Sequence, residues 1–357
     1  MNIHIQENAD EAQIITSARY VCTANHGFAP YAQEELRRLF GSVKSTVLVP
    51  GEVLLVTLPQ EPQKIERQFA EVQPLFLRHM FPVGWQWTIN EENLGQAWED
   101  ELVQYLLDDE WLKGAKVAIQ PRKSEGALWQ ESALSLKDML QTRLDELGAE
   151  FVVRDADWII SVFISKDQVL AGISTPRQNL SDWNGGAIRF QREEGQISRA
   201  KFKLLEAESV FDINFSAFHE ALDIGAAPGG WSSFLLERGL KVTAVDPAKM
   251  HPSILASPQL THIRKNADSL KFRDGEFDLL VCDMSWNPKQ TAKMVIDLLY
   301  ALVPGGTAVV TVKLMSKKPM ALIQEVISLF EAAQMQVQRA KQLFHNRDEI
   351  TIYMIKY

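Results

Sequence analysis

The stretch Ala221-Leu-Asp-Ile-Gly-Ala-Ala-Pro-Gly-Gly-Trp231 decides the fold of the C-terminal half of this chain. An apolar run that ends at Asp223 and passes directly into glycines predicts a strand, a tight loop and the first turn of a helix. Apolar residues continue at helical spacing up to Gly239, and residues 241–246 form a β-branched run that ends in a second carboxylate. This order of strand, glycine loop, helix, strand and acid predicts the βαβ half of a nucleotide-binding sheet.

The glycine loop favours a nucleotide that places no phosphate against the helix. It lacks the second glycine of the dinucleotide motif Gly-x-Gly-x-x-Gly, and Pro228 has no amide to donate to a pyrophosphate. S-adenosylmethionine carries a sulfonium and an ammonium but no phosphate, so carboxylates nearby favour its binding. We expect Asp246 to accept hydrogen bonds from its ribose, and Asp268, after a strand-like run at 260–266, to accept from its adenine amine. An ordinary glycine turn with surface acids is the alternative.

Composition predicts a multi-domain protein of the cytoplasm. The 357 residues are 46% hydrophobic and 23% charged, which predicts two or three domains. We expect no membrane-spanning segment and no secretory signal, since no apolar run approaches ~18 residues and no basic region precedes one at the N-terminus. Cys22 and Cys282 lie far apart in apolar runs, which favours a reducing compartment. We find no metal-ligand cluster in the sequence and expect no metal.

Charge at first argues against a nucleic-acid partner, because the net charge is -9. The acidity is concentrated at 91–190, with 18 Asp and Glu against 10 Lys and Arg, whereas 191–357 holds 20 basic and 19 acidic residues. The C-terminal part can therefore present a basic face, although ordinary solvated charges are the alternative. The candidates for that face are Arg189, Arg192, Arg199, Lys201, Lys317, Lys318, Arg339, Lys341 and Arg347.

The chain divides into an N-terminal domain at 1–90, a second domain at 91–178, a linker at 179–197 and the nucleotide-binding domain at 198–357. The first domain is α+β, with strands predicted at 18–23, 43–49 and 53–58 and helices at 31–40 and 65–77. The second has helices predicted at 97–111 and 132–147 and strands at 85–89, 116–120, 151–154, 158–164 and 169–173. The linker is indicated by Pro176 and the run Asn184-Gly-Gly186.

The C-terminal domain adds further strands that end in charged residues. A serine-capped helix at 198–207 carries Lys203, for which a surface lysine is the alternative. Strands are predicted at 277–284, ending near Asp283, and at 307–313, ending in Lys313, with helices at 291–303 and 321–333. Strands at 337–343 and 349–355 close the domain, and the short loop between them makes the last strand antiparallel. Since ligands bind at the carboxyl ends of parallel strands, Asp223, Asp246, Asp283 and Lys313 should converge on one rim.

These motifs together resemble the FtsJ-like ribose 2′-O-methyltransferases over about residues 190–357. The resemblance is carried by Ser198-Arg-Ala-Lys-Phe-Lys-Leu204, by the glycine loop, by Asp283-Met284, by Lys313 and by the late Glu349. It implies a Rossmann-like class I methyltransferase domain with a mixed seven-stranded sheet whose last strand is antiparallel. The chain departs from the family in Asp283-Met-Ser-Trp-Asn287, where the family has Ala-Pro before the asparagine.

The resemblance also implies the site residues. The Lys-Asp-Lys-Glu catalytic set of the family falls on Lys203, Asp283, Lys313 and Glu349. The S-adenosylmethionine site falls on Ser198, Asp223, Gly225, Ala227, Pro228, Gly229, Gly230, Trp231, Asp246, Asp268 and Asp283.

The N-terminal domains resemble a ferredoxin-like module followed by a THUMP domain, a pairing found ahead of RNA-modifying domains. The resemblance rests on Gly27-Phe-Ala-Pro-Tyr-Ala-Gln-Glu-Glu-Leu36 and on residues 158–172. With the ending Gln342-Leu-Phe-His-Asn-Arg-Asp-Glu-Ile-Thr351, it implies a bacterial enzyme that methylates a cytidine ribose in large-subunit (23S) ribosomal RNA. It implies no membrane partner; the oligomeric state stays open, with a monomer favoured.

The chemistry can also be argued from the residues. A ribose hydroxyl is a poor acid, so the base that takes its proton must be strong and uncharged, and a lysine meets this need when burial and a second cation lower its pKa. We expect Lys313 to be the base, Lys203 the second cation, Asp283 the group that orients Lys313, and Glu349 the group that fixes Lys203 or the hydroxyl. Cys282 is not expected to act, because strand alternation turns it to the other face.

Two functions of other classes stay open. A nicotinamide-dependent oxidoreductase would use the same βαβ half, although Pro228 and the two lysines disfavour it. The second is a non-catalytic RNA-binding or ribosome-assembly factor on a methyltransferase fold.

Overall fold

The computed structural model describes residues 17–90, 98–192, 194–316 and 318–357, which belong to two compact units. Unit 1 is formed by Met1–Thr23, Ala32–Gln73 and His79–Asp182. Unit 2 is formed by Ala24–Tyr31, Pro74–Arg78 and Trp183–Tyr357. Each unit has hydrophobic residues buried in its own interior.

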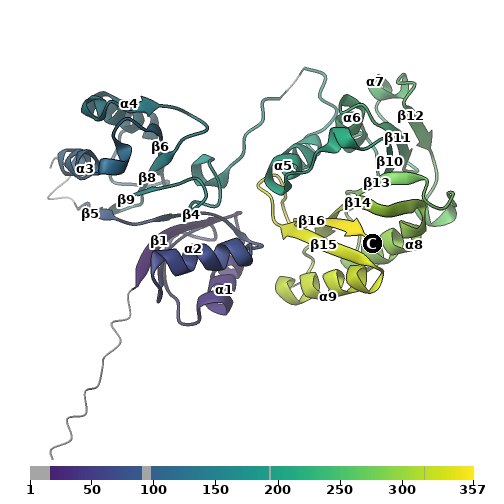
Figure 1. Cartoon of the computed structure of the whole chain (residues 1–357), viewed down its shortest axis with the longest axis horizontal. Helices are drawn as coiled ribbons and strands as arrows, with labels where there is room; N and C mark the ends of the chain where they lie inside the picture. Colours follow the sequence, from purple (N-terminus) through teal and green to yellow (C-terminus); the bar gives the residue numbers. More distant parts are fainter. Residues whose placement is uncertain (1–16, 91–97, 193, 317) are drawn as a thin grey trace, which may run out of the picture. The chain divides into compact units, whose positions relative to one another are not determined.

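A four-stranded sheet with two helices comes first along the chain (Figure 1). Its elements are β1 (Ala18–Ala24), α1 (Ala29–Phe40), β2 (Lys44–Val49), β3 (Val53–Leu58), α2 (Pro62–Glu71) and β4 (Leu77–Pro82). The strand order β2-β3-β1-β4 with the chain order βαββαβ is the ferredoxin-like arrangement. The sequence prediction of one helix over 65–77 is wrong at its C-terminal end, because Pro74 cannot continue a helix and an apolar strand follows it.

A five-stranded sheet with the order β5-β9-β8-β6-β7 makes up the rest of unit 1. Its elements are β5 (Trp85–Thr88), α3 (Trp98–Leu107), β6 (Lys116–Lys123), α4 (Ala133–Arg143), β7 (Glu150–Phe151), β8 (Trp158–Ile164) and β9 (Gln168–Ser174). The helix predicted at 132–147 is shorter than expected: the Ser132 side chain accepts from the Ser135 amide before the first turn, and a 3-10 turn replaces the last one. Helices α3 and α4 lie on the same face of this sheet (Figure 1).

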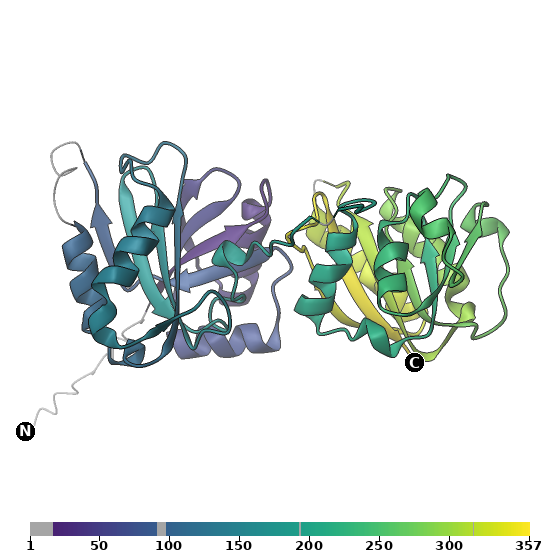
Figure 2. The ribbon, with the colours of Figure 1, turned by 90° about the horizontal axis from the view of Figure 1, so that it is seen from above.

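Unit 2 contains a seven-stranded mixed sheet of order β12-β11-β10-β13-β14-β16-β15. Its strands are β10 (Glu220–Ile224), β11 (Lys241–Val245), β12 (Leu260–Ile263), β13 (Phe277–Cys282), β14 (Leu302–Lys313), β15 (Met335–Lys341) and β16 (Glu349–Lys356). Strand β16 is antiparallel to both β14 and β15, whereas β10–β14 pair in parallel. The predicted Rossmann-like sheet with an antiparallel last strand is confirmed, and Figure 2 shows β15 and β16 at one edge.

Helices cover both faces of this sheet, with α5 and α6 on one face and α8 and α9 on the other (Figure 1). The helices of the unit are α5 (Lys201–Phe211), α6 (Gly230–Glu237), α7 (Pro252–Leu255), α8 (Pro288–Leu298) and α9 (Pro319–Ala332). Helix α8 begins and ends earlier than predicted, because the Asn287 side chain caps its first turn by accepting from the Lys289 amide. Strand β14 then starts at Leu302, and its pairing with β13 shifts register around Pro304-Gly-Gly306 instead of ending there.

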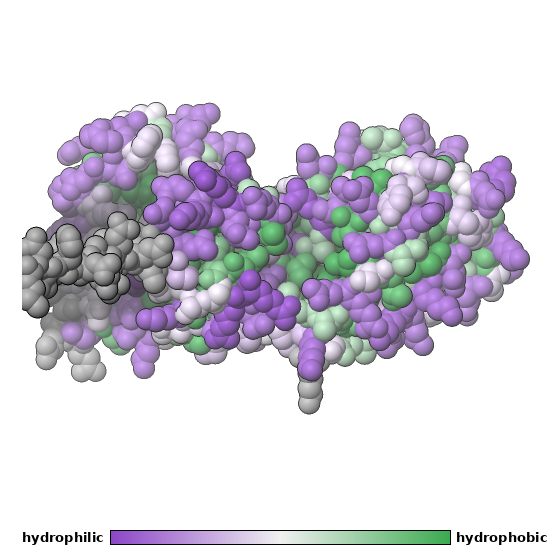
Figure 3. Space-filling model, turned by 60° about the horizontal axis from the view of Figure 1, so that its bottom comes forward, coloured by the Kyte–Doolittle hydropathy of each residue, from purple (hydrophilic) through white to green (hydrophobic). Residues whose placement is uncertain are grey.

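The interior of unit 2 is mainly apolar, with buried polar residues such as Asp223, Glu206 and Glu349 among its apolar ones. Buried residues such as Phe234, Leu279 and Val309 form the core between the sheet and helices α5 and α6. Figure 3 shows one face of the molecule, where hydrophilic residues dominate and hydrophobic ones lie in the recesses between them. Within the ranges described above, none of the helices has the length and hydrophobicity that crossing a membrane requires.

Candidate active site

Three glycines shape the loop between β10 and α6, and each is needed for close packing. Gly225 has φ 73°, and a Cβ there would lie 2.4 Å from the Met284 Cγ. Gly229 has φ 114°, and its Cβ would lie 2.3 Å from Ile254 Cδ1. A Cβ on Gly230 would lie 2.3 Å from the Ser198 Oγ. The loop therefore fits tightly between the start of α5, α7 and the end of β13, and it leaves backbone rather than side chains facing a ligand.

Asp246, directly after β11, ties the glycine loop to the neighbouring strand. Its carboxylate accepts from the Ala227 amide at 3.1 Å and from the Ala248 amide at 2.7 Å. Each carboxylate oxygen keeps a second lone pair that can accept a hydrogen bond from a ribose hydroxyl. The residue is thus compatible with the predicted ribose contact.

Asp223 is buried at the end of β10, with 1% of its surface exposed. The Ser232 Oγ donates to its Oδ2 at 2.7 Å. Burial first, and then the negative charges of Asp283 and Asp246, raise the pKa of this carboxyl to about 7 against the opposing hydrogen bond from Ser232. A cation in the site would relieve this accumulation of negative charge, which fits the sulfonium and ammonium of S-adenosylmethionine.

Lys203, Asp283, Lys313 and Glu349 form one cluster at the carboxyl ends of the strands. The Lys203 Nζ lies 2.9 and 3.0 Å from the two Asp283 oxygens and 2.7 Å from Glu349 Oε1. Lys313 donates to Glu349 Oε2, in keeping with the direct pairing of these two residues between β14 and β16. Two lysine and two carboxylate side chains thus meet in one place, where opposite charges attract each other.

The cluster keeps Lys203 and Glu349 charged. Burial alone would lower the pKa of Lys203, but its contacts with Asp283 and Glu349 outweigh this and raise it. Burial alone would raise the pKa of Glu349, but the two lysines lower it. Lys203 is therefore a fixed cation.

The pairing corrects one part of the expected roles. Asp283 contacts Lys203 and accepts from the Thr311 Oγ1 at 2.6 Å, whereas Lys313 is held by Glu349. Glu349, instead of Asp283, is the group that orients Lys313. Thr311 was missed in the sequence, although it lies two residues before Lys313 on the same face of β14.

A pocket of about 340 Å³ opens beside the cluster. Lys203, Lys313 and Glu349 line it on one side, and the corner 344–347 between β15 and β16 lines it on the other, with Arg199 on its wall. Asp283 is not among the residues that line it; this carboxylate bonds Lys203 and Thr311, and its negative charge acts on Asp223 at the end of β10.

Glu206 fixes that corner and was not anticipated from the sequence. It lies on α5 three residues after Lys203, and its oxygens accept from the amides of Phe344 and His345 at 2.7 and 2.8 Å. Burial raises the pKa of Glu206 to about 7, against the lowering by these two amides. The only signal in the sequence was a glutamate among the apolar residues Leu204, Leu205 and Ala207.

Three predicted cofactor residues have structural contacts of their own. The Ser198 Oγ accepts from the Ala200 amide at 3.2 Å, so it closes the turn before α5, which begins at Lys201 and not at 198. Trp231 is buried, and its indole donates to the Ala200 carbonyl at 2.9 Å. Asp268 lines a pocket of about 330 Å³ together with Trp286. Ser198 and Trp231 thus hold the loop in place, and Asp268 is open to a ligand.

The predicted basic face is only partly available. Lys201 is buried and pairs with Glu237 at 2.8 Å, and Lys341 donates to the Pro74 and Leu77 carbonyls within unit 2. Lys317 lies outside the described residues. Arg199 and Arg347 are exposed at the pocket, so they remain available for phosphates.

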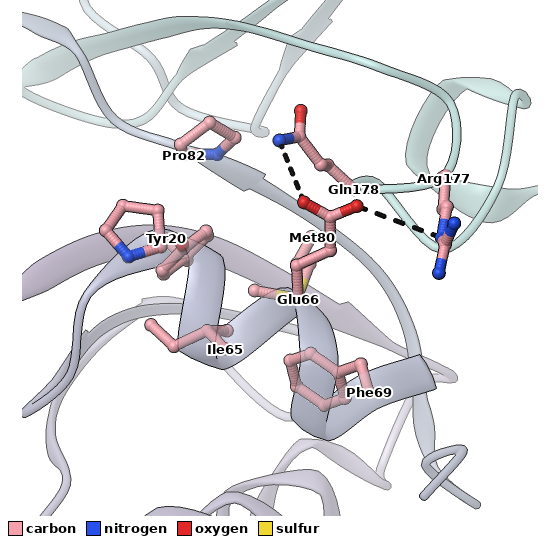
Figure 4. Close-up of a pocket in the computed structure, with 9 residues that line it drawn as sticks. Tyr20, Ile65, Glu66, Phe69, Met80, Pro82, Arg177 and Gln178 are labelled. Atoms are coloured by element: carbon pink, nitrogen blue, oxygen red, sulfur yellow. Dashed lines mark hydrogen bonds and ion pairs between the residues drawn. The ribbon is translucent and has the colours of Figure 1, made fainter. Parts of the chain in front are cut away.

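A second cavity, in unit 1, is too small for a nucleotide. It has a volume of about 50 Å³ between α2 and the strands β1 and β4 (Figure 4). Its one acid, Glu66, accepts from Gln178 at 3.4 Å and lies 3.8 Å from Arg177, as the dashed lines in Figure 4 show. Ligand pockets usually occupy about 300 Å³ or more. This cavity is a packing feature of unit 1.

Comparison with known proteins gives a family match and several relatives. Residues 196–340 match the model of the FtsJ-like methyltransferase family. Ribosomal RNA large subunit methyltransferase M of Laribacter hongkongensis is 32% identical over 249 residues, covering 66% of this chain and 69% of that protein. The protein of the same name from Aeromonas hydrophila is 33% identical over 211 residues, covering 54% and 55%. The chain thus spans about two thirds of the first relative and about half of the second.

Among solved structures, the crystal structure of TrmN from Thermus thermophilus matches 95% of this chain and 100% of that one, with a TM-score of 0.40 and 13% identity. The seven-stranded sheet, the glycine loop and the family match define an S-adenosylmethionine-dependent methyltransferase. Within that class, the chain belongs to the ribosomal RNA large subunit methyltransferase M family.

Proposed function

We propose that this protein transfers a methyl group from S-adenosylmethionine to a ribose 2′-hydroxyl of large-subunit ribosomal RNA. The observation that carries the proposal is the cluster of Lys203, Asp283, Lys313 and Glu349 between the glycine loop and a pocket of about 340 Å³. A nucleotide bound in that pocket would bring its sugar against the two lysines. The names of the relatives support ribosomal RNA as the substrate, and the resemblance of the whole chain supports a cytidine of the 23S molecule.

The cofactor supplies a methyl group that is already activated by its positive sulfur. The protein therefore has to align the hydroxyl oxygen with that methyl and take up the hydroxyl proton. As the new O–C bond forms and the S–C bond breaks, the proton moves to the Nζ of Lys313. Glu349 holds Lys313 with one carboxylate oxygen and Lys203 with the other, so the two lysines are fixed next to each other. Asp283 holds Lys203 in place.

The cofactor residues have distinct parts in this proposal. The backbone of Gly225, Gly229 and Gly230, with the carboxyl group of Asp223, would hold the amino-acid part of S-adenosylmethionine. Asp246 would accept from its ribose and Asp268 from its adenine amine. The loop disfavours a nicotinamide dinucleotide, since Pro228 has no amide to donate to a pyrophosphate.

The N-terminal part would bind the RNA outside the site. We assign residues 91–178 as a THUMP-like RNA-binding domain, residues 1–90 as the ferredoxin-like domain, residues 179–197 as the linker and residues 198–357 as the catalytic domain. The protein would act as a monomer in the cytoplasm, where ribosomal RNA is made.

The test is a transfer assay with tritiated S-adenosylmethionine and ribosomal RNA from cells that lack this protein. We expect label in large-subunit RNA, at a ribose by mass spectrometry of the digested nucleosides. Lys313→Ala should lose transfer by about 100-fold or more while calorimetry finds unchanged cofactor binding. His219→Ala, at the opposite end of β10, is the matched control and should transfer normally. Label on a base, or normal transfer by Lys313→Ala, would contradict the proposal.

A further inference from the structure

Three aromatic rings at the edge of the pocket form a triangular cluster and not a column. The ring centroids of Phe190 and Phe202 lie 5.6 Å apart, those of Phe190 and His345 5.5 Å, and those of Phe202 and His345 5.2 Å. If the three rings were stacked in a single column, one of these centroid distances would be the sum of the other two. The ring of Phe190 is stacked against those of Phe202 and His345, with planes inclined by 27° in both pairs, and the rings of Phe202 and His345 are tilted by 43°. We call these three residues the aromatic platform.

The platform keeps part of its surface open and is continuous with the pocket. Each of its residues is only partly buried. His345 also lines the pocket that holds Lys203 and Lys313, so it belongs to both features. A ligand whose polar part enters the pocket would therefore have its next part over the rings.

His345 is better explained by a ligand than by packing. Its Nε2 is buried and makes no hydrogen bond with any described residue, while the ring bonds the backbone of Ile188. An unpaired buried nitrogen is unfavourable, and phenylalanine would fill the space without it. Burial lowers the pKa of His345, so the ring is neutral near pH 7 and suits stacking. The platform is an aromatic surface beside a charged pocket.

The platform is held rigidly. Glu206 accepts from the amides of Phe344 and His345, and the Asn346 side chain accepts from the Leu343 amide at 2.8 Å and from Thr351 at 3.1 Å. Phe202 lies on α5 next to Lys203. One helix therefore carries a ring of the platform, a lysine of the cluster and the anchor of the corner, which fixes the rings relative to the reacting atoms.

Unpaired bases stack on such surfaces, whereas paired bases in an RNA duplex cannot. The exposed guanidinium groups of Arg199 and Arg347 at the same pocket suit the phosphates of a strand that crosses it. We propose that the RNA reaches this site as a single strand, with one base stacked on the aromatic platform beside His345, its ribose in the pocket and its phosphates at the two arginines. This inference rests on the proposed function and adds the form in which the RNA is bound.

The experiment measures binding of a fluorescein-labelled single-stranded RNA of about 12 nucleotides, and of the same RNA annealed to its complement, to the full chain. The wild type should bind the single strand more tightly than the duplex. His345→Ala should weaken single-strand binding about 5- to 150-fold, as loss of one stacked base does. His345→Phe keeps a ring and should stay within about threefold of the wild type. His219→Ala, an exposed histidine at the other end of the sheet, is the control and should bind normally.

Calorimetry with S-adenosylmethionine checks that each variant is folded and binds the cofactor unchanged. Equal binding of single strand and duplex by the wild type, unchanged binding by His345→Ala, or equal losses in His345→Ala and His345→Phe would each overturn the platform. Failure of the proposed function alone would give another result. The wild type would then bind the single-stranded RNA through the His345 ring but transfer no methyl group to ribose. A His345→Ala protein that methylates RNA with an unchanged KM would leave the proposed function intact and exclude the platform.

Discussion

Lys203 lies between two carboxylates, which raise its pKa and keep it protonated. It is therefore a fixed positive charge and not a base. Lys203→Met would leave Asp283 and the buried Glu349 with one partner fewer. We expect transfer to fall at least about 100-fold, because the cation beside Lys313 is gone. The free energy of unfolding should fall by about 1–3 kcal/mol, the usual result of under-pairing a buried charge. Transfer assays and urea unfolding measure the two effects.

A second substitution separates charge balance from catalysis. Adding Glu349→Gln to Lys203→Met removes the under-paired carboxylate, so part of the lost stability should return while transfer stays low. Transfer by Lys203→Met within about threefold of the wild type would show that Lys203 has no function in the reaction.

Asp223 makes cofactor affinity depend on pH. Its carboxyl has a pKa of about 7 in the folded protein, so it is neutral below that pH and negative above it. A cationic ligand prefers the negative form, and the dissociation constant of S-adenosylmethionine should decrease about tenfold from pH 6 to pH 8. Calorimetry at several pH values measures this. The dependence should vanish in Asp223→Asn and be smaller for S-adenosylhomocysteine, which lacks the sulfonium charge.

The raised pKa of the Asp223 carboxyl also makes the stability of the folded protein depend on pH. Its pKa is raised from 3.8 in the unfolded chain, so the folded state holds the proton more tightly. The stabilisation is complete below pH 3.8 and is lost as the pH rises through about 7. An affinity for S-adenosylmethionine that does not change between pH 6 and pH 8 would place Asp223 away from the bound cation.

At the scale of the element, helix α5 connects the cluster to the corner that lines the pocket. Glu206→Gln would leave one acceptor for two amides and turn an NH₂ group toward an N–H. We expect a loss of about 1–3 kcal/mol in unfolding free energy and a higher KM for RNA, with the affinity for S-adenosylmethionine unchanged. Steady-state kinetics and thermal unfolding measure these effects.

The matched control lies on the same helix. Glu208 pairs with Arg238 at 2.6 Å, and both side chains are about a quarter exposed, at 27% and 26%. Glu208→Gln should therefore cost no more than about 1 kcal/mol and leave the KM for RNA unchanged. If both variants raise the KM equally, Glu206 has no specific part in holding the corner.

On the scale of the whole molecule, the cofactor residues all belong to unit 2. Two units with separate cores should unfold in two calorimetric transitions. S-adenosylmethionine at 100 times its dissociation constant should stabilise unit 2 by about 2.7 kcal/mol and leave the other transition in place. Gly225→Ala, whose Cβ would meet Met284, should abolish the shift. A shift of both transitions would show that the two units unfold together.

The sequence by itself determined the pieces whose signals are local. Apolar runs ending in Asp223, Asp246 and Lys313 defined strand ends, and glycine spacing defined the loop, because strand alternation and backbone freedom are read from neighbouring residues. The rule that parallel strands present their carboxyl ends together then predicted a common rim. The antiparallel last strand followed from the short loop before it.

Only the tertiary structure decided which charges meet. Lys203 and Asp283 are 80 residues apart, and Glu206 reaches a corner 138 residues away. The packing of α5 across the strand ends decides two contacts. It decides whether Asp283 faces Lys203 or Lys313, and which ring of the corner lies beside Phe202. Such contacts depend on how the whole core packs together. The spacing of residues along the chain does not predict this packing.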